Sequence, residues 1–327
     1  MLTEISNILS DSDLALFLSL FESEINARYP FSSRMTALAF KESHLTMRES
    51  FGYFSLAKKI WKGIDSNGHA LGFTVATEKR GGSVKFGPTL ILSGKRNLGI
   101  GSQLRRLVED IYQANGFRKA YSTTNLSNRA GLMYLLKIGY KVELHLQNHF
   151  EIGKDELVLS RFLKSSQPKP ISQTTTSSDS MPADLTFEER RMWSDIENDF
   201  DIDATYVNSI RNNLREELCF TEGAFKNKLG KLFVSPCRNC IALAIPKRGG
   251  CVKLFPIVLS GSSNVDTGLI TDVCRYSGSA IHKLYTLVPA RRTGKIRMLK
   301  AIGFFAEGLI REPYKRGVDV IHMSFML

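Results

Sequence analysis

The sequence predicts a mixed α/β fold that is present twice along the chain. Strand-like and helix-like segments alternate in both halves of the 327 residues, and one segment recurs almost unchanged. Lys79–Lys85 reads Lys-Arg-Gly-Gly-Ser-Val-Lys, and Lys247–Lys253 differs from it only at the fifth residue. Three further similarities follow in the same order, and such ordered matches indicate an internal repeat. We therefore expect two copies, each a mixed, mostly antiparallel sheet flanked by helices.

A change of composition separates the two copies. Residues 164–184 consist largely of Ser, Thr, Pro and Gln, which cannot bury a core and are typical of a linker. The chain length also favours two domains over one. The expected organisation is a first domain over residues 1–163, a linker over 164–184 and a second domain over 185–327.

The first copy is expected to open with helices and continue with strands. Asp11 can cap a helix that runs to about Arg28, and a second helix is expected over Thr46–Lys62. A hairpin follows, because two strand-like segments, Ala70–Glu78 and Val84–Ser93, flank the glycine-rich turn Lys79–Gly82.

The remaining elements of the first copy alternate. A loop over Gly94–Gly101 leads into a helix over Ser102–Ala114, whose apolar residues Leu104, Leu107, Val108 and Ile111 recur at helical spacing. The segments expected after it are a strand Lys119–Thr124, a helix Arg129–Ile138, and strands Tyr140–Gln147 and Glu156–Phe162.

Composition limits the classes of protein. The formal charge of +12 is spread evenly over the two halves, without a block of five like charges, so a basic nucleic-acid-binding arm is not expected. An acidic partner or a nucleic acid remains compatible with this charge. The acidic N-terminal segment does not fit a secretory signal, and no apolar run approaches the roughly 20 residues of a membrane helix.

The cysteines point to a reducing compartment. All five lie in the second half, and an odd number fits reduced cytoplasmic thiols better than a disulfide framework. Cys237, Cys240 and Cys251 can supply three zinc ligands, but no second pair completes four. Buried strand cysteines are therefore favoured, and no metal is expected.

The segment most suited to bind a ligand is a glycine loop between a strand and a helix. Gly99 and Gly101 lack Cβ atoms, so backbone N–H groups there can approach a ligand, and the following helix adds a partial positive charge. Lys95 and Arg96 flank this loop. The pattern predicts a phosphate or pyrophosphate site, with a tight turn of positive φ as the alternative.

Two motifs in the first copy resemble those of the GNAT superfamily of N-acetyltransferases. Arg96-x-x-Gly99-x-Gly101 is similar to the family's Gln/Arg-x-x-Gly-x-Gly/Ala loop, which binds the pyrophosphate of acetyl-CoA. Asn128–Tyr140 resembles its second motif, Asn-x-x-Ala-x-x-x-Tyr-x-x-x-Gly-Phe, with Ala130 and Tyr134 at matching spacing. Asn128 stands one position from the motif's asparagine. The resemblance covers about residues 69–163 well and, through the repeat, the whole chain loosely.

The resemblance implies roles for particular residues. Tyr134 matches the general acid that protonates the leaving CoA thiolate, and a backbone N–H near Leu92 or Ser93 can polarise the thioester carbonyl. The residues expected to contact acetyl-CoA are Ile91, Leu92, Ser93, Arg96, Asn97, Leu98, Gly99, Ile100, Gly101, Ser102 and Asn128. The acceptor would be an amine, and Glu78, His149 and Glu151 are the candidates for a general base, although each can equally be a solvated surface residue.

The second copy lacks the same features. Aligning the repeats places Ser263 at Arg96, Asp266 at Gly99 and Met298 at Tyr134, while Asn264, Val265 and Gly268 keep the loop recognisable. A carboxylate would repel pyrophosphate, and methionine cannot donate a proton. We therefore expect an N-acyltransferase with one active site and a degenerate second copy. The alternative is a non-catalytic binding or regulatory protein that acts on nucleic acid or an acidic protein.

Overall fold

The computed structural model describes residues 2–25, 33–46, 53–163, 185–200, 202, 205–235, 238, 240–259, 268–278 and 281–327. The chain divides into two compact units. The first consists of Met1–Ser50, Phe54–Val142 and Leu157–Gln173, and the second of Phe51–Tyr53, Glu143–Glu156 and Thr174–Leu327. Residues 164–184, expected as a linker, lie outside the described residues. The expected boundaries did not anticipate that Glu143–Glu156 is grouped with the second unit.

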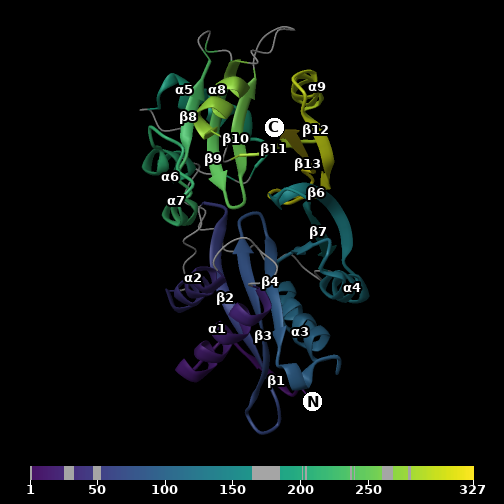
Figure 1. The fold of residues 1–327 in the computed structure, drawn as a ribbon. Helices are drawn as coiled ribbons and strands as arrows, with labels where there is room; N and C mark the ends of the chain where they lie inside the picture. Colours follow the sequence, from purple (N-terminus) through teal and green to yellow (C-terminus); the bar gives the residue numbers. More distant parts are fainter. Residues whose placement is uncertain are drawn as a thin grey trace. The chain divides into compact units, whose positions relative to one another are not determined.

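The first unit is a mixed sheet covered by helices, which confirms the predicted fold class (Figure 1). Its strands follow the order β1-β2-β3-β4-β5-β7, in which β4 and β5 are parallel and the pairs from β1 to β4 are antiparallel. The elements are β1 (Glu4–Ser6), α1 (Asp11–Ile25), α2 (Ser33–Thr46), β2 (Ser55–Ile64), β3 (Ala70–Lys79), β4 (Ser83–Ile91), a short 3-10 turn (Ser93–Lys95), α3 (Ile100–Ala114), β5 (Lys119–Asn125), α4 (Arg129–Lys137) and β7 (Lys154–Phe162).

The two faces of this sheet carry different helices. Leu14 and Phe17 of α1 join Ile60, Phe73 and Leu90 in a core on one face. On the other face, α3 and α4 contribute to a second core, which contains Leu104, Val108, Leu135, Val84 and Phe86. The glycine loop, at the start of α3, therefore belongs to the face opposite α1.

The helix expected over Thr46–Lys62 is wrong. Residues from Ser55 onward form β2, which pairs antiparallel with β3 along its length, and the second helix lies earlier, at Ser33–Thr46. The apolar residues Ile60 and Trp61 are compatible with a helix and with a strand. Pairing with β3 makes the segment a strand, because strand preference depends on tertiary context. The later elements occupy their expected places, with ends shifted by a few residues.

A β-bulge divides β4 into two parts. Thr74 pairs with Thr89 and Ala76 with Phe86, so that Gly87 and Pro88 of β4 stand opposite the single residue Val75 of β3. An extra residue reverses the faces of the side chains that follow it. Phe86 accordingly packs in the α3 core, whereas Leu90, an even number of residues later, packs in the α1 core.

The pairing of β4 with β5 ends at this bulge. The parallel ladder runs from Ser83 and Lys119 to Phe86 and Ser122, where the Ser122 hydroxyl donates to the Phe86 carbonyl at 3.0 Å. The rest of β4, Gly87–Ile91, is not paired with β5. We call these residues the diverging segment of β4.

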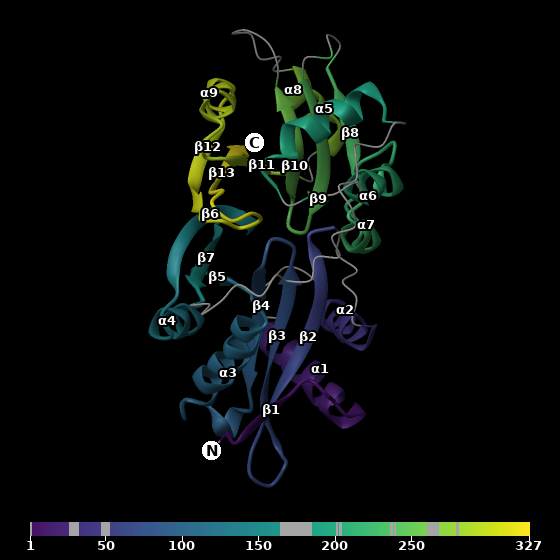
Figure 2. The ribbon, with the colours of Figure 1, turned by 180° about the vertical axis from the view of Figure 1, so that it is seen from behind.

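The second unit repeats this element order. Its sheet has the order β6-β12-β13-β11-β10-β9-β8, with β10 and β11 parallel and a bulge at Phe255 and Pro256 opposite Leu243. Its helices cover both faces of the sheet (Figure 2). The elements are β6 (Lys141–Glu151), α5 (Phe187–Ile196), α6 (Thr205–Asn213), α7 (Glu222–Asn227), β8 (Lys231–Val234), β9 (Cys240–Lys247), β10 (Cys251–Leu259), α8 (Gly268–Ser277), β11 (Lys283–Pro289), α9 (Thr293–Ala301), β12 (Phe305–Ile310) and β13 (Val320–Met326).

Hydrogen bonds anchor Glu143–Glu156 within the second unit. The buried Lys283 ammonium donates to the Gln147 carbonyl at 2.7 Å and to the Glu307 carboxylate at 2.7 Å. The Gln147 N–H also donates to Glu307 at 2.7 Å. Burial raises the pKa of Glu307, but hydrogen bonds from His322, Lys283 and Ser324 outweigh it and hold the pKa at about 2. The carboxylate therefore stays ionised, and a charged cluster fixes the strand.

Two glycines allow the backbone of this segment to approach. A Cβ on Gly308 would lie 2.6 Å from the Glu143 carbonyl oxygen, and one on Gly249 would lie 2.0 Å from that of Phe150. Neither distance is compatible with a real side chain. Both positions therefore require glycine if Glu143–Glu156 is to stay in place.

Gly249→Ala is expected to destabilise the second unit more than Gly317→Ala does. Both glycines have a positive φ, of 83° and 73°, but a Cβ at Gly317 meets nothing within 4 Å. Gly317→Ala therefore measures backbone strain alone, about 1 kcal/mol, and Gly249→Ala adds the clash with Phe150. Denaturant unfolding of both variants checks this, and equal losses in free energy of unfolding would contradict it.

Candidate functional site

The glycine loop has the geometry of an anion site at a helix N-terminus. Gly99 is the N-cap of α3 and adopts the left-handed conformation, with φ 78° and ψ −3°; Asn97 also has a positive φ, of 63°. Residues 93–99 are exposed, so their backbone groups are accessible. The first N–H groups of α3 have no partner within the helix and carry its partial positive charge. Gly99 can adopt this conformation without the cost that a side chain would bring.

Tyr134 of α4 meets the start of α3. Its hydroxyl donates to the Gly101 carbonyl at 2.9 Å. A Cβ on Gly101 would lie 3.7 Å from the Tyr134 ring, 3.7 Å from the Thr89 methyl and 3.5 Å from the Ile91 side chain. The bulge explains this meeting, because it turns Thr89 and Ile91 to the α3 face. The structure thus brings together Ile91, Gly101 and Tyr134, three of the residues expected at the site, and adds Thr89.

The spacing of the second motif allows two residues, Tyr134 and Leu135, at its tyrosine position. Four residues separate Tyr134 from Gly139, one more than in the motif, so counting back from Gly139 places Leu135 at the tyrosine position and Asn128 at the asparagine. Leu135 is buried in the core, however, and it is Tyr134 whose hydroxyl reaches the loop.

Tyr134 is protonated at neutral pH. Burial raises its pKa above the ordinary value of 10, and the nearby Arg105 charge and a hydrogen bond with Thr89 offset only part of this effect. The hydroxyl therefore carries the proton that a general acid needs, and Tyr134 is unsuited to accept one.

Arg96 is held beside the loop by two contacts. Its Nε donates to the Ile91 carbonyl at 3.1 Å, and its guanidinium pairs with the Glu24 carboxylate at 2.5 Å. Lys95 precedes it in the same exposed turn. Two cations thus flank the N-terminus of α3, and Glu24 offsets one of them.

The backbone of β4 narrows the choice of oxyanion donor. The Leu92 N–H donates to the Leu71 carbonyl of the neighbouring strand at 3.1 Å. Because successive N–H groups of a strand point to opposite sides, that of Ile91, the last residue of β4, points away from β3, whereas Ser93 begins the 3-10 turn. Of the two residues expected to polarise a carbonyl, Leu92 therefore has its N–H engaged with β3.

The other expected loop and helix residues have structural roles of their own. The Asn128 side chain caps α4 by accepting from the Gly131 N–H at 3.2 Å, and it donates to the Thr124 hydroxyl at 3.3 Å. Leu98 is 68% exposed, whereas Ile100 is buried in the core and Ser102 is part of the first turn of α3.

The candidates for a general base are all engaged elsewhere. Glu78 forms an ion pair with Lys59 at 2.8 Å, and Glu151 forms one with Lys154 at 2.6 Å on the surface. His149 and Glu151 belong to the second unit, where the His149 ring packs against Tyr285. The structure does not single out any of the three.

Neither a metal group nor a membrane helix is found in the described part of the chain. Among these residues no three His, Cys, Asp or Glu side chains gather as metal ligands, and no described helix is long and apolar enough to cross a membrane. Cys240 and Cys251 are buried in strands. Cys237 lies outside the described residues.

The bulge of the second unit packs against that unit's own chain. The loop over residues 260–267, which contains the altered positions Ser263, Asn264, Val265 and Asp266, lies outside the described residues, and α8 begins at Gly268. Met298 lies in α9, in the place of Tyr134. Phe200, which is buried, packs on Phe255 of the bulge with ring centroids 4.9 Å apart.

Charge pairs hold this covering segment. The fully buried Asp199 accepts hydrogen bonds at 2.7 Å from the Nε atoms of Arg291 and Arg292, at the end of β11 and the start of α9. Lys295 pairs with Asp195 in the same way. Arg292 is the N-cap of α9, and Asn128 is the N-cap of α4. Arg292 thus stands where the first unit has a residue expected to contact acetyl-CoA, but its guanidinium forms an ion pair with Asp199.

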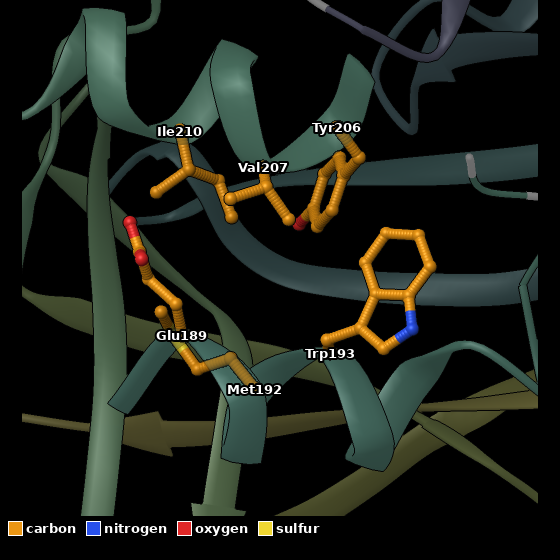
Figure 3. A pocket seen from close by; sticks show the side chains of 6 residues that line it. All are labelled: Glu189, Met192, Trp193, Tyr206, Val207 and Ile210. Carbon is orange, nitrogen blue, oxygen red and sulfur yellow. The ribbon is translucent and has the colours of Figure 1, made fainter. Parts of the chain in front are cut away.

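A small cavity between α5 and α6 does not form a ligand site. Its volume is about 10 Å³, room for at most one water molecule. The Glu189 carboxylate at its edge is bound by Arg211 at 2.6 Å. The lining side chains, shown in Figure 3, are Glu189, Met192, Trp193, Tyr206, Val207 and Ile210.

Comparisons with known proteins find similar structures and no similar sequence. No protein-family model matches the chain, and no curated protein matches it. A putative acetyltransferase of the GNAT family from Desulfovibrio desulfuricans aligns over 49% of this chain and 99% of its own, with 13% identity and a TM-score of 0.42. A GNAT phosphinothricin acetyltransferase from Sinorhizobium meliloti, in complex with acetyl-CoA, aligns over 53% and 98%, with 16% identity and a TM-score of 0.41.

A third solved structure aligns over a similar share of the chain. Spermidine N-acetyltransferase from Vibrio cholerae, in complex with CoA and spermine, aligns over 50% of this chain and 96% of its own, with 16% identity and a TM-score of 0.40. Each of these structures covers about half of the chain. GNAT acetyltransferases are also the family whose motifs the sequence resembles.

Asp199→Ala is expected to lower the free energy of unfolding of the second unit by about 1–3 kcal/mol, because it removes charged hydrogen bonds at a buried carboxylate. Asp272→Ala is the matched control, since Asp272 pairs with Arg275 on the surface, and such pairs contribute at most about 1 kcal/mol. Denaturant unfolding measures both. Equal effects would mean that the Asp199 pairs do not hold the covering segment.

Proposed function

We propose that the protein is an acyl-CoA-dependent N-acyltransferase with its active site in the first unit. The transferred group in this proposal is acetyl, and the acceptor is a primary amine. The observation that carries the proposal is the meeting of Tyr134, Thr89 and Ile91 with Gly101 at the N-terminus of α3. A proton donor thus lies beside an anion site and beside a strand that is not paired on one side.

The residues of the first unit fit the acyl donor in two places. The N–H groups from Gly99 to Ser102 and the cations Lys95 and Arg96 match a pyrophosphate. The diverging segment of β4 offers backbone groups on the side away from β3, to which the amides of a pantetheine arm can pair as a further strand does. These two features lie at the two ends of one turn, Ile91–Gly99.

Each chemical step has a candidate residue. The Ser93 N–H polarises the thioester carbonyl while the amine attacks its carbon. The C–S bond breaks with its electron pair on sulfur, and Tyr134 protonates that thiolate. The acceptor nitrogen loses one proton to water, directly or through a base, for which Glu78, His149 and Glu151 stay the candidates.

The second copy is assigned no catalysis in this proposal. Asp199 and Phe200 cover its bulge, Met298 cannot donate a proton, and Arg292 is engaged by Asp199. We take the catalytic domain as residues 1–163 and the degenerate domain as 185–327, in a cytoplasmic enzyme. The even spread of positive charge leaves an acidic acceptor, including nucleic acid, within the proposal.

Two measurements test the proposal as a whole. Calorimetry with acetyl-CoA separates an enzyme from a binding module that does not use CoA, and absence of binding would refute the proposal. Release of free thiol from acetyl-CoA, across pools of amines, peptides, amino sugars, tRNA and DNA, identifies the acceptor. A nucleic-acid acceptor would also show binding that weakens steeply with salt.

Tyr134→Phe is expected to lower turnover by about 10²–10⁴-fold, the usual contribution of general acid catalysis, while CoA still binds. Turnover and CoA affinity are measured side by side. Tyr121→Phe is the control, because Tyr121 is, like Tyr134, a partly buried tyrosine of the first unit and lies in β5. If both variants keep full turnover, Tyr134 is not the proton donor.

Gly99→Asp is expected to abolish CoA binding, and Gly99→Asn is expected to weaken it much less. Both side chains have the same size, and a Cβ at Gly99 meets nothing within 4 Å, so only backbone strain is common to them. The carboxylate adds repulsion of the pyrophosphate, although Asp is a favourable N-cap and keeps α3 intact. Calorimetry with CoA compares the two, and similar affinities would show that no phosphate binds there.

A further inference from the structure

Arg105 is a fully buried cation within the core that α3 forms with the sheet. Its side chain is 1% exposed, and its Nε donates to the Glu109 carboxylate at 3.2 Å and to the Tyr140 hydroxyl at 3.3 Å. The two terminal nitrogens, Nη1 and Nη2, are buried and have no hydrogen-bond partner among the residues that the structure describes. The protein thus satisfies one side of the guanidinium and leaves the other side unsatisfied.

Such an arrangement is unfavourable for the protein by itself. An unsatisfied buried donor costs about 1–3 kcal/mol, and more when the group is charged. Leucine or methionine would fill the same space without this cost, and replacing buried charges by apolar residues of similar volume is often neutral or stabilising. The unsatisfied nitrogens therefore point to a group that arrives from outside the protein.

The position of Arg105 connects it with the proposed site. It lies one helical turn after Gly101, on the same face of α3, and Gly101 accepts the hydrogen bond of Tyr134. The guanidinium carbon stands 3.7 Å from the centroid of the Phe86 ring. Phe86 is the last residue of β4 that pairs with β5, so the cation lies where the two strands diverge.

The charges around Arg105 favour an anion. Glu109 is shared by two cations, since Arg161 also pairs with it, at 3.3 Å, and the Tyr140 hydroxyl donates to the same carboxylate. One positive charge therefore remains in excess in this cluster. Arg105 also acts on Tyr134, whose raised pKa it partly lowers. The missing partner should therefore carry negative charge. Because Arg105 lies one helical turn from Gly101, which accepts from the Tyr134 hydroxyl, this partner would lie on the side of α3 that meets Tyr134.

We propose that Arg105 is the residue that binds the thiolate leaving group of CoA, through Nη1 and Nη2, at the point where β4 and β5 diverge. This inference rests on the proposed function, because acyl transfer is what produces an anion beside Tyr134. When the C–S bond breaks, its electron pair stays on sulfur, and Arg105 stabilises that charge until Tyr134 delivers the proton. Arg105 itself keeps its proton throughout, as guanidinium groups do.

The direct test is the pKa of the CoA thiol in the complex of CoA with the enzyme, measured without an acceptor. It is read from the ultraviolet absorbance of the thiolate as the CoA complex is titrated, with the complex of desulfo-CoA as the blank. Arg105→Met is expected to raise this pKa by at least about one unit, since a nearby opposite charge shifts a pKa by one to three units. Arg105→Lys, which keeps a charge, is expected to shift it less. Glu109 keeps Tyr140 and Arg161 as partners in both variants.

The control removes a cation elsewhere in the same unit. Lys62 is a partly buried lysine that pairs with Asp13 of α1, on the other face of the sheet, and Lys62→Met should leave the thiol pKa unchanged. If Arg105→Met does not fold, Arg105→Gln, which keeps polar donors without the charge, replaces it. If the variant without the charge binds CoA and the thiol pKa is unchanged, the role of Arg105 is refuted but the proposed function is not. Failure of the wild-type protein to bind CoA would refute the proposed function together with it.

Discussion

The first unit depends on the bulge at Gly87 and Pro88. Without the extra residue, Thr89 and Ile91 would face α1, and the glycine loop would meet the opposite side of β4. The bulge also ends the ladder with β5 and so leaves backbone groups of β4 directed away from β3. Gly87 is suited to this place because a Cβ would lie 3.2 Å from that of Val75, tighter than an ordinary contact. One local irregularity thus sets the direction of the Thr89 and Ile91 side chains that meet Gly101 and the point where β4 parts from β5.

The second unit has a bulge at the corresponding place, and its own chain packs against it. Phe255 stands where the first unit has Gly87, and its ring supports Phe200, which Asp199 holds in place through Arg291 and Arg292. An aromatic residue at a bulge adds buried apolar area, and a glycine adds none. The bulge is thus filled by aromatic packing in the second unit, whereas in the first unit it is formed by Gly87 and Pro88 and ends the pairing of β4 with β5.

Local signals made most of the fold predictable from the sequence. The turn Lys79–Gly82 fixed the hairpin, and apolar spacing fixed α3. The assignment of Thr46–Lys62 failed because a strand partner that is distant in sequence decided the outcome. Arg105 was missed for a related reason: the apolar spacing of α3 places charged residues toward solvent, yet Arg105 and Glu109 are both buried and form an ion pair. The grouping of Glu143–Glu156 rests on contacts made more than a hundred residues away, such as that between Gln147 and Lys283, and no short-range pattern encodes them.

The placement of Glu143–Glu156 gives the second unit a structural role. This segment connects α4, which carries Tyr134, with β7, which completes the sheet of the first unit. Its hydrogen-bond partners Lys283, His282 and Glu307 all belong to the second half of the chain. Residues 1–163 without these partners would expose the strand β6 and the backbone groups that they now satisfy. The buried Lys283 and Glu307, which form an ion pair and both bind Gln147, are therefore the contacts on which the position of this connection depends most.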